Sequence, residues 1–113
     1  MSKYYDLTDV NDMAGGDQDF LRVIVQTFLE EIPPDVRSMI EAIENSNPSL
    51  AYQYAHKMKP NLQLFGLNLM EQVLTVEGWS KGNATEQAAV EAGKRISAKV
   101  TLAEAQLKTD FDL

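Results

Sequence analysis

The sequence contains no cysteine, and it contains a single histidine, His56. The absence of cysteine excludes a disulfide framework, a thiolate zinc site and a cysteine nucleophile. A hydrolytic or metal-dependent enzyme is one alternative for this chain, but one histidine and no Glu-x-x-His spacing leave little from which to build it. Chemistry at neutral pH is therefore expected at His56.

Long apolar runs and positive charge are also scarce. No stretch approaches the roughly 20 apolar residues that span a bilayer, and residues 1–9 lack the basic start and apolar run of a signal peptide, so we expect a cytoplasmic protein. The formal net charge of −7 would repel phosphate backbones and anionic lipids, which argues against nucleic acid and membrane partners. Without a P-loop or GxGxxG pattern, the chain is not expected to phosphorylate itself from ATP.

What the sequence does contain is helical periodicity. The 113 residues, 44% of them hydrophobic, suit one domain over residues 1–113 with a single core. Apolar residues recur at helical spacing almost throughout, which predicts an all-α fold. Short connections between long helices predict an up-and-down bundle. The expected helices span about residues 5–13, 17–32, 34–44, 48–66, 67–81 and 84–108.

Caps and helix breakers set these boundaries. Gly15-Gly16 is expected to end the first helix, and Pro33-Pro34 is expected to end the second, because neither proline can donate to the helical ladder. Expected helix starts are Asp17, Asn47 before Pro48, and Asn83 with Glu86 three residues on.

Stripes of apolar residues predict the buried faces. The first three expected stripes are Leu7, Val10 and Met13; Phe20, Leu21, Ile24, Phe28 and Ile32; and Val36, Met39, Ile40 and Ile43. Toward the C-terminus they are Leu69, Val73, Val76 and Trp79; and Ala89, Ala92, Ile96, Val100, Ala103 and Leu107.

A helical wheel predicts where His56 points. With Met58 at the centre of the buried face, His56 falls about 160° away, on the solvent side together with Lys59. The residues expected on the buried face with Met58 are Ala51, Tyr54, Ala55, Leu62 and Phe65. A lone surface histidine is most often only a surface residue, but a largely neutral imidazole can act as a nucleophile, and Lys59 at i+3 could reach a phosphoryl group on it.

The segment Ala55-His56-Lys57-Met58-Lys59-Pro60, continuing to Phe65-Gly66-Leu67, resembles the signature of the histidine phosphotransfer (HPt) domain of bacterial two-component phosphorelays. Gly15-Gly16-Asp17 with Phe20-Leu21, and Phe28-Leu29-Glu30-Glu31, also resemble the start of such domains. The likeness covers nearly the whole chain. It implies an antiparallel four-helix bundle with an additional N-terminal helix.

The resemblance also implies roles for individual residues. His56 matches the phosphoaccepting histidine, and Lys59 matches the lysine that assists the phosphoryl group. Gly66 matches the glycine that ends the histidine-bearing helix, and Met58 matches an apolar core position. The residues that would dock a partner beside this site are Tyr52, Lys57, Pro60 and Gln63.

The chain departs from the family pattern at two places. Pro60 stands where the family usually has a glycine, and it denies the carbonyl of His56 its helical hydrogen bond. Many members also carry a glutamine on the next helix that orients the imidazole. The corresponding place lies near Gly78, so the sequence suggests that this glutamine is missing, with Gln63 as a weak substitute.

Phosphoryl relay is the function that the resemblance implies. His56 would accept a phosphoryl group from a receiver-domain aspartate, on a response regulator or a hybrid sensor kinase, and pass it to another receiver aspartate. The chain would act as a monomeric phosphocarrier rather than an enzyme, without a cofactor of its own, because the receiver would supply Mg²⁺. The alternative is a non-catalytic helical adaptor that binds a signalling partner.

Overall fold

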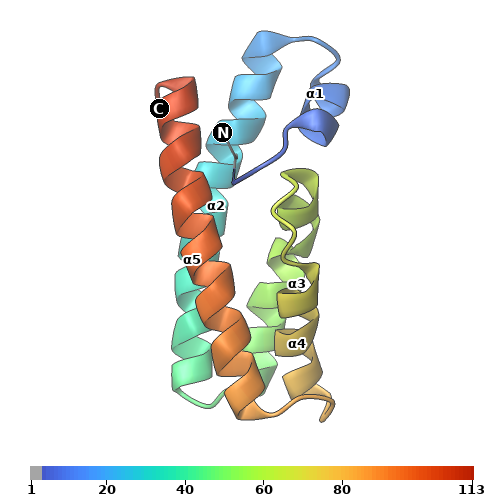
Figure 1. Cartoon of the computed structure of the whole chain (residues 1–113), viewed down its shortest axis with the longest axis vertical. Coiled ribbons are helices and arrows are strands. Elements are labelled where there is room, and N and C mark those ends of the chain that lie inside the picture. Colours follow the sequence, from blue (N-terminus) through green and yellow to red (C-terminus); the bar gives the residue numbers. More distant parts are fainter. Residues whose placement is uncertain (1–3) are drawn as a thin grey trace.

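The computed structural model describes residues 4–113, and over this range the chain is helical, with no strand (Figure 1). The all-α prediction is therefore confirmed. Its five helices are α1 (Thr8–Ala14), α2 (Gln18–Glu44), α3 (Pro48–Leu64), α4 (Met70–Ser80) and α5 (Glu86–Phe111).

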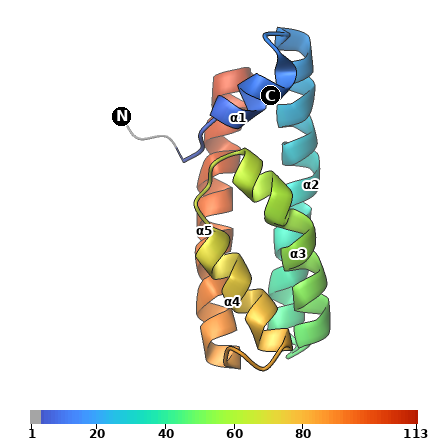
Figure 2. The same ribbon diagram turned by 90° about the vertical axis from the view of Figure 1, so that its right-hand side faces the viewer.

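Four of the helices pack side by side around one core. α2 packs against α3 and α5, and α4 packs against the same two helices (Figures 1 and 2). α2 and α5 are much longer than α3 and α4, and α1 lies beyond the turn that joins α3 to α4. The core residues come from all five helices and from the α3–α4 connection. Within the described residues, no helix combines the length and apolarity needed to cross a membrane.

Side-chain caps fix where three helices begin. The Asp17 carboxylate accepts from the amide of Phe20, and the Asn47 side chain accepts from the amide of Leu50 directly before Pro48. Both N-caps were predicted. The predicted cap at Asn83 is wrong, because the Thr85 hydroxyl accepts from the amide of Ala88 and α5 begins two residues later.

The predicted break at Pro33-Pro34 is also wrong, since α2 runs through both prolines as one helix of 27 residues. The prolines remove two donors from the ladder, but they do not interrupt the apolar face. Phe28, Ile32 and Val36 follow one another at helical spacing and are all buried. Packing of this face against α3 and α5 therefore keeps the helix continuous.

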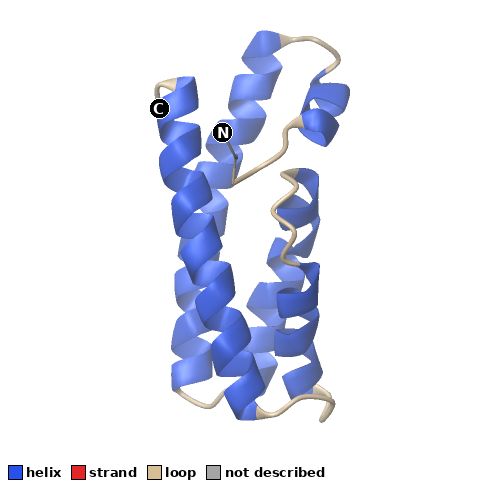
Figure 3. Cartoon of the chain, viewed as in Figure 1, coloured by secondary structure: helices blue, strands red, loops and turns tan. Residues whose placement is uncertain are grey.

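The connections differ from prediction for local reasons (Figure 3). α1 begins at Thr8 rather than near Tyr5, because the Asp6 carboxylate accepts from the amide and hydroxyl of Thr8. α4 begins only at Met70, because Gly66 and Asn68 adopt left-handed backbone conformations, with φ of 62° and 56°. A helix cannot continue through such residues.

Most predicted core positions are buried. The α5 stripe is buried along its whole length, and so are Leu21, Val36, Met39, Ile43, Leu69, Val73 and Val76. Phe20 and Met13 were predicted as core residues but are 45% and 55% exposed. Phe20 lies next to the buried set that starts at Leu21 and continues at Val25, so its own position turns outward.

Candidate functional site

His56 projects from the outer face of α3, as the helical wheel predicts. Its side chain is 60% exposed. On the opposite face, Ala55 and Met58 are completely buried. Of the residues predicted to share that buried face, Ala51, Leu62 and Phe65 are buried and Tyr54 is half-buried.

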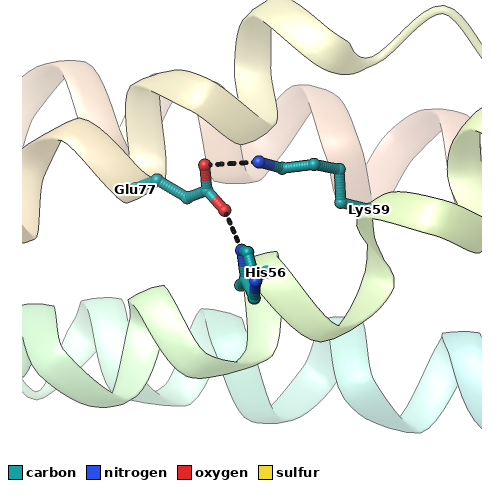
Figure 4. Close-up of polar contacts among 3 residues, drawn as sticks. All are labelled: His56, Lys59 and Glu77. Atoms are coloured by element: carbon teal, nitrogen blue, oxygen red, sulfur yellow. Dashed lines mark hydrogen bonds and ion pairs between the residues drawn. The ribbon is translucent and has the colours of Figure 1, made fainter.

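Glu77 of α4 connects His56 with Lys59 (Figure 4). One carboxylate oxygen, Oε2, lies 2.9 Å from Nδ1 of His56, and the other, Oε1, lies 2.9 Å from Nζ of Lys59. Glu77 is only 4% exposed, so both of its oxygens are held away from bulk water. Two residues one turn apart on α3 are thus joined through a single buried carboxylate on the neighbouring helix.

Glu77 is ionised at neutral pH. Burial raises the pKa of its carboxyl, but the hydrogen bonds from Lys59 and His56, with the charges of these two side chains, outweigh burial and hold the pKa below its ordinary value. An ionised carboxylate can only accept hydrogen bonds. The geometry therefore assigns the proton of a neutral imidazole to Nδ1 and leaves the lone pair on Nε2.

An aromatic ring and a second lysine extend the cluster beyond the imidazole. The ring of Tyr52 is stacked on that of His56, with 5.5 Å between the ring centroids and 8° between their planes. The ammonium group of Lys81 lies over the Tyr52 ring, 5.3 Å from its centroid. Tyr52 was predicted beside His56, whereas Lys81 was not singled out from the sequence.

Lys57, Pro60 and Gln63 were also predicted at the site. The ammonium group of Lys57 is directed to α2, where it lies 3.2 Å from Oδ1 of Asp35. Pro60 and Gln63 are exposed on α3. Pro60 lies inside a helix that runs on to Leu64, so the proline does not end α3.

Glu77 was not predicted at the site. A ring-orienting glutamine was expected near Gly78, with Gln63 as a weak substitute, but the partner of the imidazole is the neighbouring glutamate. A signal for this was present, because Glu77 lies four residues after Val73 and next to Val76, on the buried face of α4. An acidic residue on an apolar stripe requires a basic partner.

The described part of the chain contains no cluster of three or more histidine, cysteine, aspartate or glutamate side chains that could hold a metal ion.

The comparisons with known proteins give no match: no family model fits the chain, and neither a curated protein nor a solved structure is significantly similar to it.

Proposed function

We propose that this protein is a histidine phosphotransfer protein that relays a phosphoryl group through His56. The observation that carries the proposal is the hydrogen bond between Nδ1 of His56 and Glu77, at 2.9 Å, on a side chain that is 60% exposed. This bond directs the lone pair of the ring to Nε2, and the exposure gives another protein access to it. In this proposal the four packed helices α2–α5 form an antiparallel four-helix bundle of the HPt type, and α1 is the additional N-terminal helix.

The transfer step follows from the protonation of the ring. Nε2 attacks the phosphorus of an aspartyl phosphate on a receiver domain, so the N–P bond forms while the P–O bond to the aspartate breaks and its electrons return to the carboxylate. Nδ1 keeps its proton, and the ring gains positive charge as the bond forms. The Glu77 carboxylate stabilises that charge at hydrogen-bond distance.

The cationic side chain near the ring supports the same step. Lys59 is held by Glu77 with 24% of its side chain exposed, and it lies one turn from His56. Its ammonium group is the candidate to stabilise the phosphoryl oxygens on Nε2. The receiver would supply Mg²⁺, and the chain itself would act as a carrier because phosphoryl transfer requires mainly positioning and charge stabilisation.

The experiment is phosphoryl transfer from a labelled receiver domain. The wild-type protein is expected to become labelled, with the acid lability of a phosphoramidate, and to lose the label to a second receiver. His56→Gln is expected to remain unlabelled while keeping the same helical content. If the wild-type protein takes no label from receivers or from the small donor phosphoramidate, the relay proposal fails and the adaptor alternative is favoured.

A further inference from the structure

The site continues for one more helical turn along both α3 and α4. These two helices run in opposite directions (Figure 2), so Tyr52, one turn before His56, lies across from Lys81, one turn after Glu77. The contacts follow this register. His56 meets Glu77 across the helices, and Lys81 lies over the ring of Tyr52 in the same way. Along α3, the His56 and Tyr52 rings lie nearly parallel.

Each contact restrains a different motion of the imidazole. The hydrogen bond to Glu77 determines which edge of the ring faces α4, because only a nitrogen can donate to the carboxylate. One hydrogen bond still allows the ring to rock about that bond. The stacked ring of Tyr52, 8° from parallel, limits this rocking and sets the plane of the imidazole.

Such a restraint matters because the imidazole is largely exposed. An exposed side chain normally exchanges between rotamers within nanoseconds. In-line attack requires the lone pair of Nε2 to point at phosphorus when the partner docks, and holding a nucleophile in that orientation removes part of the entropic cost of the reaction. A ring that is already oriented satisfies this requirement before the partner arrives.

We propose that Tyr52 is a positioning residue that sets the plane of the His56 imidazole for attack, and that Lys81, the residue directly after α4, holds Tyr52 in place. The proposal rests on the proposed phosphotransfer function. The ammonium group of Lys81, which directly follows α4, attracts the face of the Tyr52 ring, and the same ring is stacked on the imidazole.

The test uses Tyr52→Leu, which removes the ring, and Tyr52→Phe, which keeps it. Phe20→Leu is the matched control, because it also removes an exposed aromatic ring, on α2 and away from the site. Phe20 lies about four turns along α2 from Asp35, the residue of that helix that contacts Lys57 of α3. Two quantities are measured for each protein: the ¹⁵N chemical shifts of the imidazole and the rate of phosphoryl transfer from a labelled receiver. His56 is the only histidine, so the ring signals need no assignment.

We expect wild type, Tyr52→Phe and Phe20→Leu to show one tautomer protonated at Nδ1. Tyr52→Leu is expected to keep this tautomer, because the bond to Glu77 remains, but to shift the ring signals away from those of wild type as the imidazole loses its stacked neighbour. It is expected to transfer about 3- to 10-fold more slowly, the range set by the strength of an aromatic stack. If Tyr52→Leu does not fold, Lys81→Met tests the same contact at an exposed position. It is expected to change the ring shifts and the transfer rate in the same direction as Tyr52→Leu, but by a smaller amount.

The two proposals fail in different ways. Unchanged ring shifts and an unchanged transfer rate in folded Tyr52→Leu would overturn the positioning role while the relay stands. If wild type forms no phosphohistidine, the relay proposal and the positioning of a nucleophile both fall. Changed ring shifts in Tyr52→Leu would then show that the stack orients the ring without serving this reaction.

Discussion

The carboxylate of Glu77 has both of its oxygens occupied by basic side chains, one from His56 and one from Lys59. A buried carboxylate without such partners would lose its hydration without compensation. With them, the same group fixes the edge of the imidazole, its tautomer and the position of a lysine one turn away. A substitution at this residue should therefore affect stability and chemistry together.

Glu77→Gln is expected to lower the free energy of unfolding by about 2–4 kcal/mol. Glutamine has a similar shape, but it removes the negative charge that compensates Lys59. Its amide nitrogen must also face either Lys59, which is another donor, or Nδ1 of His56, which can accept only if the imidazole changes tautomer. Urea denaturation at neutral pH measures the change. Glu41→Gln, at an exposed position of α2, is the control and should change stability by less than about 0.5 kcal/mol. A loss at Glu77 no larger than at Glu41 would contradict this account.

The lowered pKa of Glu77 also predicts how stability depends on pH. A carboxyl whose pKa is lower in the folded state contributes stability that is complete above its ordinary pKa of about 4.3 and is lost as pH falls through the lower folded-state value. The difference in unfolding free energy between wild type and Glu77→Gln should therefore shrink on acidification across this window. Urea titrations at a series of pH values test it, and a difference that stays constant from neutral to strongly acidic pH would argue against an ionised Glu77.

Sequence periodicity located part of this site. It placed His56 and Lys59 on the outer face of α3, since 3.6 residues per turn fix that angle whatever the neighbours are. It could mark Glu77 as an acidic residue on an apolar stripe, but it could not pair Glu77 with His56. Contact between α3 and α4 depends on the register of two helices joined by a connection with two left-handed residues, Gly66 and Asn68. The same register decides which residue lies across from Tyr52.

At the scale of single helices, α2 is the clearest case in which tertiary packing overrides local preference. Two adjacent prolines predict a break, yet the helix extends from Gln18 to Glu44. Pro34 and Glu30 are exposed, so the carbonyl of Glu30 that loses its donor can be hydrated. The starts of α2 and α3 did follow from the capping residues Asp17 and Asn47, which act locally and can be recognised from the sequence.

Pro34→Ala is expected to raise the free energy of unfolding by about 1–2 kcal/mol. Alanine restores the donor to the carbonyl of Glu30 and suits the helix, and this gain exceeds the entropy that the unfolded chain recovers when the proline is removed. Urea denaturation compares it with Glu31→Ala, an exposed non-proline position of the same helix. A stability at or below that of Glu31→Ala would mean that the proline costs α2 nothing.

At the scale of the whole molecule, the N-terminal segment and the long helices hold the bundle together. The amide of Asp6 donates to the carbonyl of Phe65 at 2.8 Å, which ties the segment before α1 to the end of α3. The hydroxyl of Tyr5 is hydrogen-bonded to Asp110 of α5. On the other side, α2 and α5 approach each other closely at Gly93, where a Cβ atom would lie 2.9 Å from Cδ1 of Ile43.

This close approach can be tested by making the same substitution at two helical glycines. At Gly78 of α4, an added Cβ would meet its nearest neighbours at 3.6 Å, an ordinary contact, so Gly78→Ala should raise the free energy of unfolding by about 0.5–1 kcal/mol through helix propensity alone. Gly93→Ala gains the same propensity but pushes against Ile43, so it should fall short of Gly78→Ala by about 1 kcal/mol or more. Urea denaturation of both variants measures the difference directly. Equal gains would mean that the end of the Ile43 side chain gives way at little cost and that the spacing of the two long helices is not set at Gly93.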